Sequence, residues 1–351
     1  MAARYPCINS TPLNNGVAGM EREMKFVLVT GAGGFLGTAI TRKLVSLGVG
    51  TRALVRSEQK AALFVGDGAD VSICDIRSAG IKDAVARADT VIHCAAVLGP
   101  TSLPRESFDS INVGGTRNLV EVLQESHDLR RFVHISSVAV VGDTDRDNPA
   151  DERMACHPID DYGQSKLAAE NIVLKMAVNG FPAVVARPMW IYGASSLVTT
   201  NLFRKIAKRK LPMIGRGLNT MQPVALNDAV DCIVKCATVP GIEGRIFNIA
   251  GSEILTVRSM CETIAKAMNT TLPTLTVPMS VALPLARFLE RLLPVVGIDS
   301  PLTTKKLEFF RVNNSYSIER ARTELGWMPK KTFEQGAHEI AQAMKLMQQP
   351  S

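Results

Sequence analysis

Two side chains in the middle of the chain have the types and the spacing needed to move a proton. Tyr162 and Lys166 are four residues apart, at the start of a segment that predicts a helix to about Asn179, so the phenol and the amine share one helical face. A tyrosine has an unperturbed pKa of about 10, but a neighbouring ammonium favours the phenolate and makes proton exchange with an alcohol or a carbonyl feasible. Because such a pair also arises by chance in many helices, its meaning depends on what surrounds it.

Two further polar side chains are expected close to this pair. Ser137 ends the run His-Ile-Ser-Ser at 134–137, which follows an apolar strand and brings a hydroxyl to the carboxyl edge of a sheet. Asn112 is expected to begin a helical turn near the same edge. Together with Tyr162 and Lys166, these side chains predict a catalytic site of four residues.

A glycine-rich turn near the amino terminus predicts a phosphate-binding loop. Gly31, Gly34 and Gly37 are three residues apart, between an apolar strand and a helical pattern that starts at Phe35. The first glycine permits a tight turn, the second lets backbone approach a pyrophosphate, and the third allows close packing of helix and strand. The first helical turn, with Phe35 and Leu36, then offers N–H groups and a partial positive charge. A purely structural turn is the alternative, but the position of the triplet at the opening of an α/β chain favours a dinucleotide.

The end of the second expected strand, at 54–57, indicates which dinucleotide is bound. A carboxylate there would hold a ribose 2′-hydroxyl and repel a 2′-phosphate. The chain has Arg56 instead, and a guanidinium can form a fork on phosphate. We therefore predict NADP(H) as the preferred cofactor, with NAD(H) as the alternative if Arg56 is only an exposed surface residue.

These residues are positioned by strands that alternate with helices. Apolar strands are expected at 25–30, 51–55, 71–74, 90–94, 131–136 and 183–186. This pattern predicts an α/β fold with a doubly wound parallel Rossmann sheet. The dinucleotide-binding domain is expected at 25–187, completed by about 223–250, with a smaller, mainly helical substrate-binding lobe at 188–222 and 251–345 and a flexible tail at 1–24.

Composition and charge restrict the class of protein. The 351 residues are 46% hydrophobic and 21% charged, as in an ordinary globular protein. The basic run at 204–210 contributes to the net charge of +7, and we interpret it as a solvated helix face, with contact to an anionic substrate tail as the alternative. Because the run lacks aromatic residues, no nucleic-acid partner is expected. Seven dispersed cysteines favour reduced thiols in the cytoplasm, and Cys232 and Cys236 predict core thiols rather than metal ligands.

The segment 278–296 is the most apolar stretch of the chain. Arg287, Glu290 and Arg291 interrupt it, and no apolar run reaches the roughly 18 residues that a membrane-spanning helix needs. The pattern predicts an amphipathic helix. We interpret it as a lid over an apolar pocket, with peripheral contact to a membrane surface as the alternative.

In order and spacing, the motifs resemble those of the extended short-chain dehydrogenase/reductases, the NAD-dependent epimerase/dehydratase superfamily, over about residues 25–335. The matching segments are 30–37, 75–76, 93–96, 112–116, 136–137, 162–166, 187–193, Asp228, 247–249 and 325–329. The runs at 187–193 and 316–322 are most similar to the branch that contains the 3β-hydroxysteroid dehydrogenases.

The resemblance implies a role for each matching residue. Tyr162 is the general acid/base, Lys166 holds the nicotinamide ribose and lowers the tyrosine pKa, and Ser137 hydrogen-bonds the substrate oxygen. Asn112 supports the lysine through the helix it begins. The other matches line the dinucleotide: Asp75 and Ile76 beside the adenine, Cys94, Ala95 and Ala96 along its length, and Pro188 and Ile191 beside the carboxamide. In such relatives, helices equivalent to 105–125 and 162–179 pair in a homodimer.

Trp190 bears on the substrate. Many nucleotide-sugar members of the family have an asparagine at this position, whereas tryptophan offers a flat apolar wall and one donor. We predict reversible hydride transfer between NADP(H) and an alcohol or ketone on an apolar, steroid-like substrate. A nucleotide-sugar epimerase or dehydratase with tightly held NAD(P) is the first alternative. A non-catalytic sensor that keeps the dinucleotide site is the second, and the intact set of Ser137, Tyr162 and Lys166 argues against it.

Overall fold

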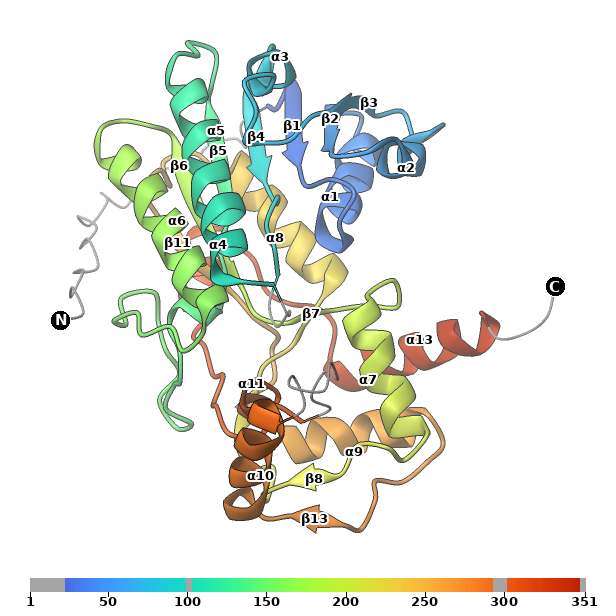
Figure 1. The fold of residues 1–351 in the computed structure, drawn as a ribbon. Helices are drawn as coiled ribbons and strands as arrows, with labels where there is room; N and C mark the ends of the chain where they lie inside the picture. Colours follow the sequence, from blue (N-terminus) through green and yellow to red (C-terminus); the bar gives the residue numbers. More distant parts are fainter. Residues whose placement is uncertain (1–22, 99–102, 293–301, 348–351) are drawn as a thin grey trace.

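A seven-stranded parallel sheet organises the larger part of the protein (Figure 1). The computed structural model describes residues 23–98, 103–292 and 302–347. The sheet has the spatial order β11-β6-β5-β4-β1-β2-β3, and every neighbouring pair is parallel. Its strands are β1 (Phe26–Thr30), β2 (Gly50–Val55), β3 (Asp70–Ile73), β4 (Thr90–His93), β5 (Arg131–Ile135), β6 (Ala183–Pro188) and β11 (Ile246–Ile249). The predicted doubly wound α/β fold is confirmed.

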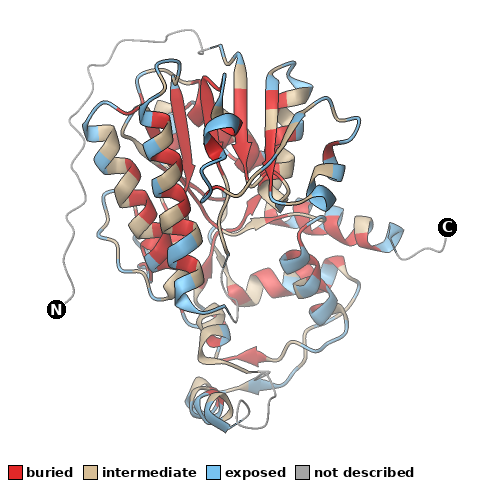
Figure 2. Ribbon diagram, turned by 45° about the horizontal axis from the view of Figure 1, so that its top comes forward, coloured by how far each residue is buried: buried red, intermediate tan, exposed pale blue. Residues whose placement is uncertain are grey.

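The central strands are apolar on both faces because helices cover both sides of the sheet (Figure 2). In β1, for example, Val27 and Val29 belong to one apolar cluster and Leu28 to the other. The first face is covered by α1 (Phe35–Ser46) and α8 (Leu226–Thr238), and the second by α3 (Ile81–Val85), α5 (Gly115–Gln124) and α6 (Asp161–Val178).

A smaller lobe lies beyond the carboxyl ends of the strands (Figure 1). Its core is formed by the packed helices α7 (Leu197–Ala207), α9 (Val257–Ala267) and α13 (Phe333–Leu346). Three short strand pairs accompany them: β7 (Ile191–Tyr192) with β10 (Val224–Ala225), β9 (Thr220–Met221) with β12 (Leu255–Thr256), and β8 (Met213–Ile214) with β13 (Thr276–Val277). Helices α10 (Met279–Leu292) and α11 (Thr304–Leu307) form the far end of this lobe.

The carboxyl-terminal part of the chain returns to the sheet before it ends in the lobe. Helix α12 (Glu319–Glu324) packs against β11, and Ala321, Leu325 and Trp327 join the core of the sheet domain. The expected lobe range of 251–345 is therefore interrupted, because a sequence pattern does not show which core a short helix joins. Most of the expected amino-terminal tail, residues 1–22, lies outside the described residues.

The helix expected at 105–125 is continuous but not uniformly α-helical. It consists of α4 (Arg105–Phe108), a π-helical segment (Asp109–Gly114) and α5. Asn112 therefore lies inside this helix, and the expectation that it begins a helical turn is wrong. Segments of π-helix are found frequently at functional sites.

The basic run and the cysteine pair of α8 lie where the sequence predicts. The basic side chains of the 204–210 run are exposed, whereas Cys232 and Cys236 are buried in the core of the sheet domain. Within the described ranges, no group of three or more His, Cys, Asp or Glu side chains is arranged to hold a metal ion. Among the described helices, none combines the length and the apolar character needed to cross a membrane.

Candidate active site

The predicted phosphate loop has a backbone geometry that only glycine fits at two positions. Gly31 has a φ of +64°, and a Cβ on it would lie 2.7 Å from the Cα and the nitrogen of Ala95. A Cβ on Gly37 would lie 2.3 Å from the carbonyl oxygen of Gly31. The loop, the chain after β4 and helix α1 are therefore in close backbone contact, as the spacing of the glycines predicts.

The amino terminus of α1 opens onto this loop. Gly34 is the N-cap residue, and no side chain among the described residues caps the helix there. The N–H of Gly34 donates to the Gly31 carbonyl at 3.0 Å, while the N–H groups of Phe35 and Leu36 belong to the first turn, which has no intrahelical acceptors. An uncapped helix end beside a glycine turn fits the pyrophosphate of a dinucleotide.

Helix α6 presents Tyr162 and Lys166 together, as predicted. The helix begins where the Asp160 carboxylate accepts a hydrogen bond from the N–H of Gly163 at 2.7 Å. One turn further, Nζ of Lys166 donates to the carbonyl oxygen of Ile135 at 2.5 Å, at the carboxyl end of β5. The charge of Lys166 also opposes the burial that raises the pKa of Cys94, whose backbone borders Gly31. The amine is therefore fixed at the carboxyl end of β5.

Ser137 lies beside the phenol. It follows β5 directly, and its hydroxyl accepts a hydrogen bond from the N–H of Ala139 at 3.2 Å at the start of the 3₁₀ turn Val138–Val140. The Ser137 side chain is also close enough to Tyr162 to lower the pKa of the phenol, and a Cβ on Gly163, next to Tyr162, would lie 2.6 Å from the Ala139 carbonyl oxygen. The structure thus brings Ser137, Tyr162 and Lys166 together at the carboxyl edge of the sheet.

The protonation states of this pair follow from burial. Burial raises the pKa of Tyr162 to about 12, and the Ser137 side chain offsets this only in part. The lowering by Lys166 that the resemblance implies is not found among the causes of this shift. Burial lowers the pKa of Lys166 to about 8, against the opposing effects of Cys94 and Glu170. At neutral pH the phenol is therefore protonated and the amine is mostly charged, which suits donation of a proton to a carbonyl oxygen.

Asn112 connects the π-helical segment with two other elements. Its Oδ1 accepts from the N–H of Val97 at 2.7 Å, and its Nδ2 donates to the Val97 carbonyl at 3.1 Å and to Oγ of Ser165 at 2.9 Å. Ser165 precedes Lys166 and donates to the Tyr162 carbonyl at 2.8 Å. Asn112 therefore positions α6 through Ser165, a contact that sequence reasoning missed, and it is a positioning residue rather than a catalytic one.

Behind the site lies a chain of hydrogen bonds in which the donor of each bond is defined, and the sequence did not predict it. The N–H of Ala95 donates to Oγ1 of Thr30 at 3.2 Å, and this oxygen lies 2.8 Å from Nδ1 of His93. Nε2 of His93 lies 3.0 Å from Oγ1 of Thr116, whose proton is given to the Asn112 carbonyl at 2.6 Å. Nε2 must therefore carry the ring hydrogen. Burial lowers the pKa of His93 to about 3, so the ring is neutral.

A buried ion pair lies between helix α6 and the sheet. Glu170 and Arg187 are each only 1% exposed and are joined by two hydrogen bonds, and Ser136 donates to the same carboxylate at 2.6 Å. Arg187 belongs to β6, so the pair ties α6 to the sheet. Sequence reasoning gave Glu170 no role, because nothing in its local context distinguishes it from an exposed helical glutamate.

The adenine end of the predicted cofactor site contains Arg56 and Asp75. Arg56 is exposed directly after β2. Asp75 accepts hydrogen bonds from Nε and Nη2 of Arg77 at 2.9 and 2.8 Å. This contact holds the pKa of the Asp75 carboxyl at about 2, and Arg56 makes a smaller contribution in the same direction. Ile76 is buried against α5, where a Cβ on Gly115 would lie 2.3 Å from it. Asp75 is therefore ionised and already paired with Arg77.

Lys60 is a candidate cofactor residue that sequence reasoning did not find. It belongs to α2 (Glu58–Ala61), and a Cβ on Gly33 would lie 2.9 Å from Cβ and Cδ of Lys60. The stem of the lysine therefore lies over the phosphate loop, and the amine extends from the same short stretch that carries Arg56. The signal was a basic residue one helical turn after Arg56.

The expected substrate side lies where the sheet meets the lobe. Pro188 ends β6 and Ile191 begins β7, so both are at the carboxyl edge. Trp190, between them, is half-buried, packs against the lobe core, and has its ring centroid 6.5 Å from that of Tyr192. The predicted role of Trp190, as an apolar wall of the substrate site, stays a prediction.

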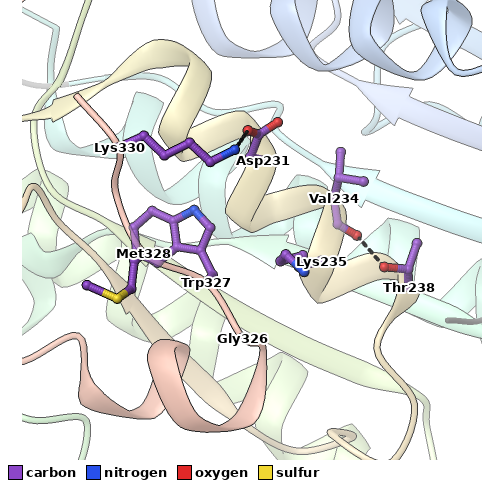
Figure 3. Close-up of a pocket in the computed structure, with 8 residues that line it drawn as sticks. All are labelled: Asp231, Val234, Lys235, Thr238, Gly326, Trp327, Met328 and Lys330. Carbon is purple, nitrogen blue, oxygen red and sulfur yellow. Dashed lines mark hydrogen bonds and ion pairs between the residues drawn. The ribbon is translucent and has the colours of Figure 1, made fainter. Parts of the chain in front are cut away.

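Two hollows on the described surface contain none of these residues. One has a volume of about 310 Å³ and lies between α8 and the chain after α12, where Lys330 forms an ion pair with Asp231 (Figure 3). The other has a volume of about 340 Å³ and lies between α10 and α11. The candidate site is therefore defined by the edge of the sheet and not by either hollow.

Comparison with known proteins agrees with this geometry. Residues 27–250 match the model of the NAD dependent epimerase/dehydratase family. The chain is 26% identical over 327 residues to the 4-hydroxy-2-methyl-3-oxo-4-farnesyl-3,4-dihydroquinoline-1-oxide ketoreductase of Stigmatella aurantiaca, covering 90% of this chain and 95% of that protein. It is 26% identical over 353 residues to the 3 beta-hydroxysteroid dehydrogenase/Delta 5-->4-isomerase of Mycobacterium tuberculosis, covering 92% and 91%.

A solved structure with the same fold is UDP-glucuronic acid 4-epimerase from Bacillus cereus in complex with NAD. It has a TM-score of 0.73 at 19% identity, covering 92% of this chain and 100% of that one. The family match spans more than half of the chain and includes the glycine loop, Ser137, Tyr162 and Lys166. The chain therefore belongs to the NAD-dependent epimerase/dehydratase family and is an enzyme of the extended short-chain dehydrogenase/reductase type with a nicotinamide cofactor.

Proposed function

We propose that the protein is an NADP(H)-dependent oxidoreductase that interconverts an alcohol and a ketone or aldehyde on an apolar substrate. One observation carries this proposal. The hydroxyls of Ser137 and Tyr162 lie together at the carboxyl end of β5, and Lys166, one turn further along α6, is fixed to the same strand end.

The chain's own groups supply the acid–base part of the reaction. When bound, a nicotinamide dinucleotide supplies or accepts the hydride at a substrate carbon. In the reductive direction, Tyr162 donates its proton to the substrate oxygen, and Ser137 donates a hydrogen bond that polarises the carbonyl. Lys166, fixed to the end of β5, would hold the ribose of the nicotinamide. Oxidation of the alcohol uses the same groups in reverse.

The proposed preference for NADP(H) is supported by Arg56 and Lys60. Both are basic, both follow β2, and Lys60 lies over the phosphate loop, so a ribose 2′-phosphate would meet positive charge here. We expect Arg56→Ala to weaken NADPH binding by about 10–100-fold and to change NADH binding little, because one charge-assisted hydrogen bond is lost. Titration of both dinucleotides measures this. Arg42→Ala, at an exposed arginine paired with Asp67, is the matched control. Equal losses for both dinucleotides would contradict the preference.

The proposed apolar substrate is supported by Trp190 and by two relatives. The name of one describes a farnesyl-bearing ketone, and the other is a hydroxysteroid dehydrogenase. The epimerase relative supports the alternative, a nucleotide-sugar epimerase or dehydratase that keeps its dinucleotide tightly bound.

One experiment separates these functions. The protein is incubated with NADPH and a panel of apolar ketones, or with NADP and the matching alcohols, and dinucleotide absorbance is followed. A dehydrogenase changes the absorbance, whereas an epimerase returns the hydride and leaves no net change. We expect Tyr162→Phe to lower kcat by about 10²–10⁴-fold with unchanged NADPH affinity. Tyr316→Phe, at a buried tyrosine outside the site, is the control. Retained turnover in Tyr162→Phe would overturn the proposal.

A further inference from the structure

Helix α10 presents an apolar stripe that faces away from the protein. The helix appears mostly exposed or half-buried at the bottom of Figure 2. The stripe recurs at intervals of four, three and four residues and spans about 60° of the helix surface. Its members are Val281, Leu285, Phe288 and Leu292, whose exposed fractions are 55%, 45%, 60% and 50%.

The other face of the same helix makes the contact with the protein. Ala282 and Ala286 are buried and pack with Ile214 of β8 and Leu307 of α11. The helix therefore has apolar residues on two sides, because Met279 and Leu283 pack with these alanines while the residues of the stripe face outward. Helix α9 of the same lobe differs, because its large apolar residues Met260 and Ile264 are fully buried.

Positive charge accompanies the stripe. Arg287 and Arg291 are exposed on one flank of it. The only acid of the helix is Glu290, whose carboxylate accepts from the N–H and the hydroxyl of Thr304 at 2.9 and 3.1 Å, toward α11. Helix α11 adds two lysines. The stripe is therefore bordered on one flank by Arg287 and Arg291, and the acid of the helix is engaged within the protein.

We propose that α10 binds the surface of an anionic lipid bilayer, with its apolar stripe below the headgroups and Arg287 and Arg291 among them. An exposed apolar stripe bordered by basic residues is typical of an interfacial helix. The 14 residues of α10 extend about 21 Å, which is too short for the roughly 30 Å of a hydrocarbon core, so the helix lies in the plane of the surface.

Two other occupants fit the stripe less well. A second copy of α10 would offer these arginines no carboxylate of its own, because Glu290 is engaged with Thr304. A lid, our first interpretation of this segment, would have to turn the stripe inward, whereas Ala282 and Ala286 already occupy the inner face.

The position of α10 in the molecule gives the proposed membrane contact a function. Glu308, directly after α11, has its pKa raised by burial and by the nearby Asp160, the N-cap residue of the helix that carries Tyr162. This end of the lobe therefore lies on the side of the amino terminus of α6, the helix that carries Tyr162. The use that follows would be delivery of an apolar substrate from the bilayer to that edge. This use rests on the proposed function, but the binding itself does not.

Co-sedimentation of the full chain with vesicles tests the binding. We expect the protein to bind phosphatidylcholine vesicles that contain about one-third phosphatidylglycerol, to bind pure phosphatidylcholine more weakly, and to lose the difference at high salt. The double variant Leu285→Glu/Phe288→Glu should lower the partition coefficient at least about tenfold. Val178→Glu/Leu346→Glu, at equally exposed apolar positions on α6 and α13, is the charge-matched control and should bind like the parent.

Two further variants keep the result decisive. Arg287→Gln/Arg291→Gln should bind both vesicle types alike, and Phe288→Trp should show blue-shifted emission with anionic vesicles. Melting temperatures confirm that each variant is folded. The proposal is overturned if the parent chain does not bind anionic vesicles, if the Leu285/Phe288 variant binds as well as its control, or if the stripe variant converts a dimer into a monomer without changing vesicle binding. None of these readouts depends on turnover, so failure of the proposed reaction would be recognised separately.

Discussion

The sheet edge and the lobe differ in how firmly their side chains are held. At the edge, Lys166 is bound to the end of β5, and Asn112 is bound to both backbone groups of Val97. In the lobe, the strands are pairs of only two residues each, and α10 leaves an apolar face outward. We therefore expect the chemistry to depend on backbone geometry at the edge, and the proposed choice of substrate and surface to depend on side chains of the lobe. Substitutions in the two regions should therefore change different measured quantities.

The largest effect is expected at the sheet edge, from Gly37→Ala. The new Cβ would lie 2.3 Å from the Gly31 carbonyl oxygen, so the loop and α1 must separate. We expect NADPH binding to weaken at least about 100-fold, as measured by calorimetric titration, because the helix end no longer approaches the pyrophosphate. Gly80→Ala is the control, since its Cβ would lie no closer than 3.6 Å to any neighbour. Unchanged affinity in Gly37→Ala would contradict the claim that backbone geometry at the sheet edge determines dinucleotide binding.

A smaller effect of a different kind is expected at the border of the lobe, from Trp190→Ala. Loss of the apolar wall should raise the KM for an apolar substrate by about tenfold. The kcat at saturation and the NADPH affinity should change little, because the Ser137–Tyr162–Lys166 set is intact. Steady-state kinetics test this, with Trp190→Phe as the conservative control. A loss confined to kcat would show instead that Trp190 positions the reacting groups.

The smallest expected effect is on the free energy of unfolding, and it concerns one buried polar side chain in the sheet domain. His134 is fully buried between His93 and Phe132, and neither ring nitrogen has a hydrogen-bond partner among the described residues. Removing this buried polar group in His134→Leu should stabilise the fold by about 1 kcal/mol.

The gain should depend on pH in a defined direction. Burial lowers the pKa of His134 well below 6.5, so below about pH 6.5 the unfolded chain binds a proton that the folded chain does not. The histidine therefore costs more stability as the pH falls, and the advantage of His134→Leu should grow between pH 7.5 and 5.5. Thermal melts at both values measure this, with His127→Gln at an exposed position as the control. A variant less stable than the parent at both values would mean that the ring is well accommodated.

Features with a local signal were predictable from the sequence. The first strand was expected at 25–30 and lies at Phe26–Thr30, because an apolar run before a glycine loop is a local pattern. The pairing of Tyr162 with Lys166 depends only on helical periodicity, and the roles of Gly31 and Gly37 only on their spacing. For these elements, a few adjacent residues determine the geometry.

Features that depend on the folded environment were not predictable. Lys60 meets Gly33 across the end of β2, and Asn112 meets Ser165 at a separation of 53 residues. The raised pKa of Tyr162 is an effect of burial, which a motif does not report. The return of α12 to the sheet was missed because an apolar stripe shows that a helix has a buried side but not which core receives it.

The π-helical segment at Asp109–Gly114 has a consequence for any molecule that docks along this helix. One additional residue in a turn rotates everything beyond it by about 100° relative to a regular α-helix. Helices α4 and α5 both contact α6, and α5 also contacts α3 and packs on the sheet. Deletion of one residue inside the segment would bring them back into phase and would swing the Asn112 amide away from Val97.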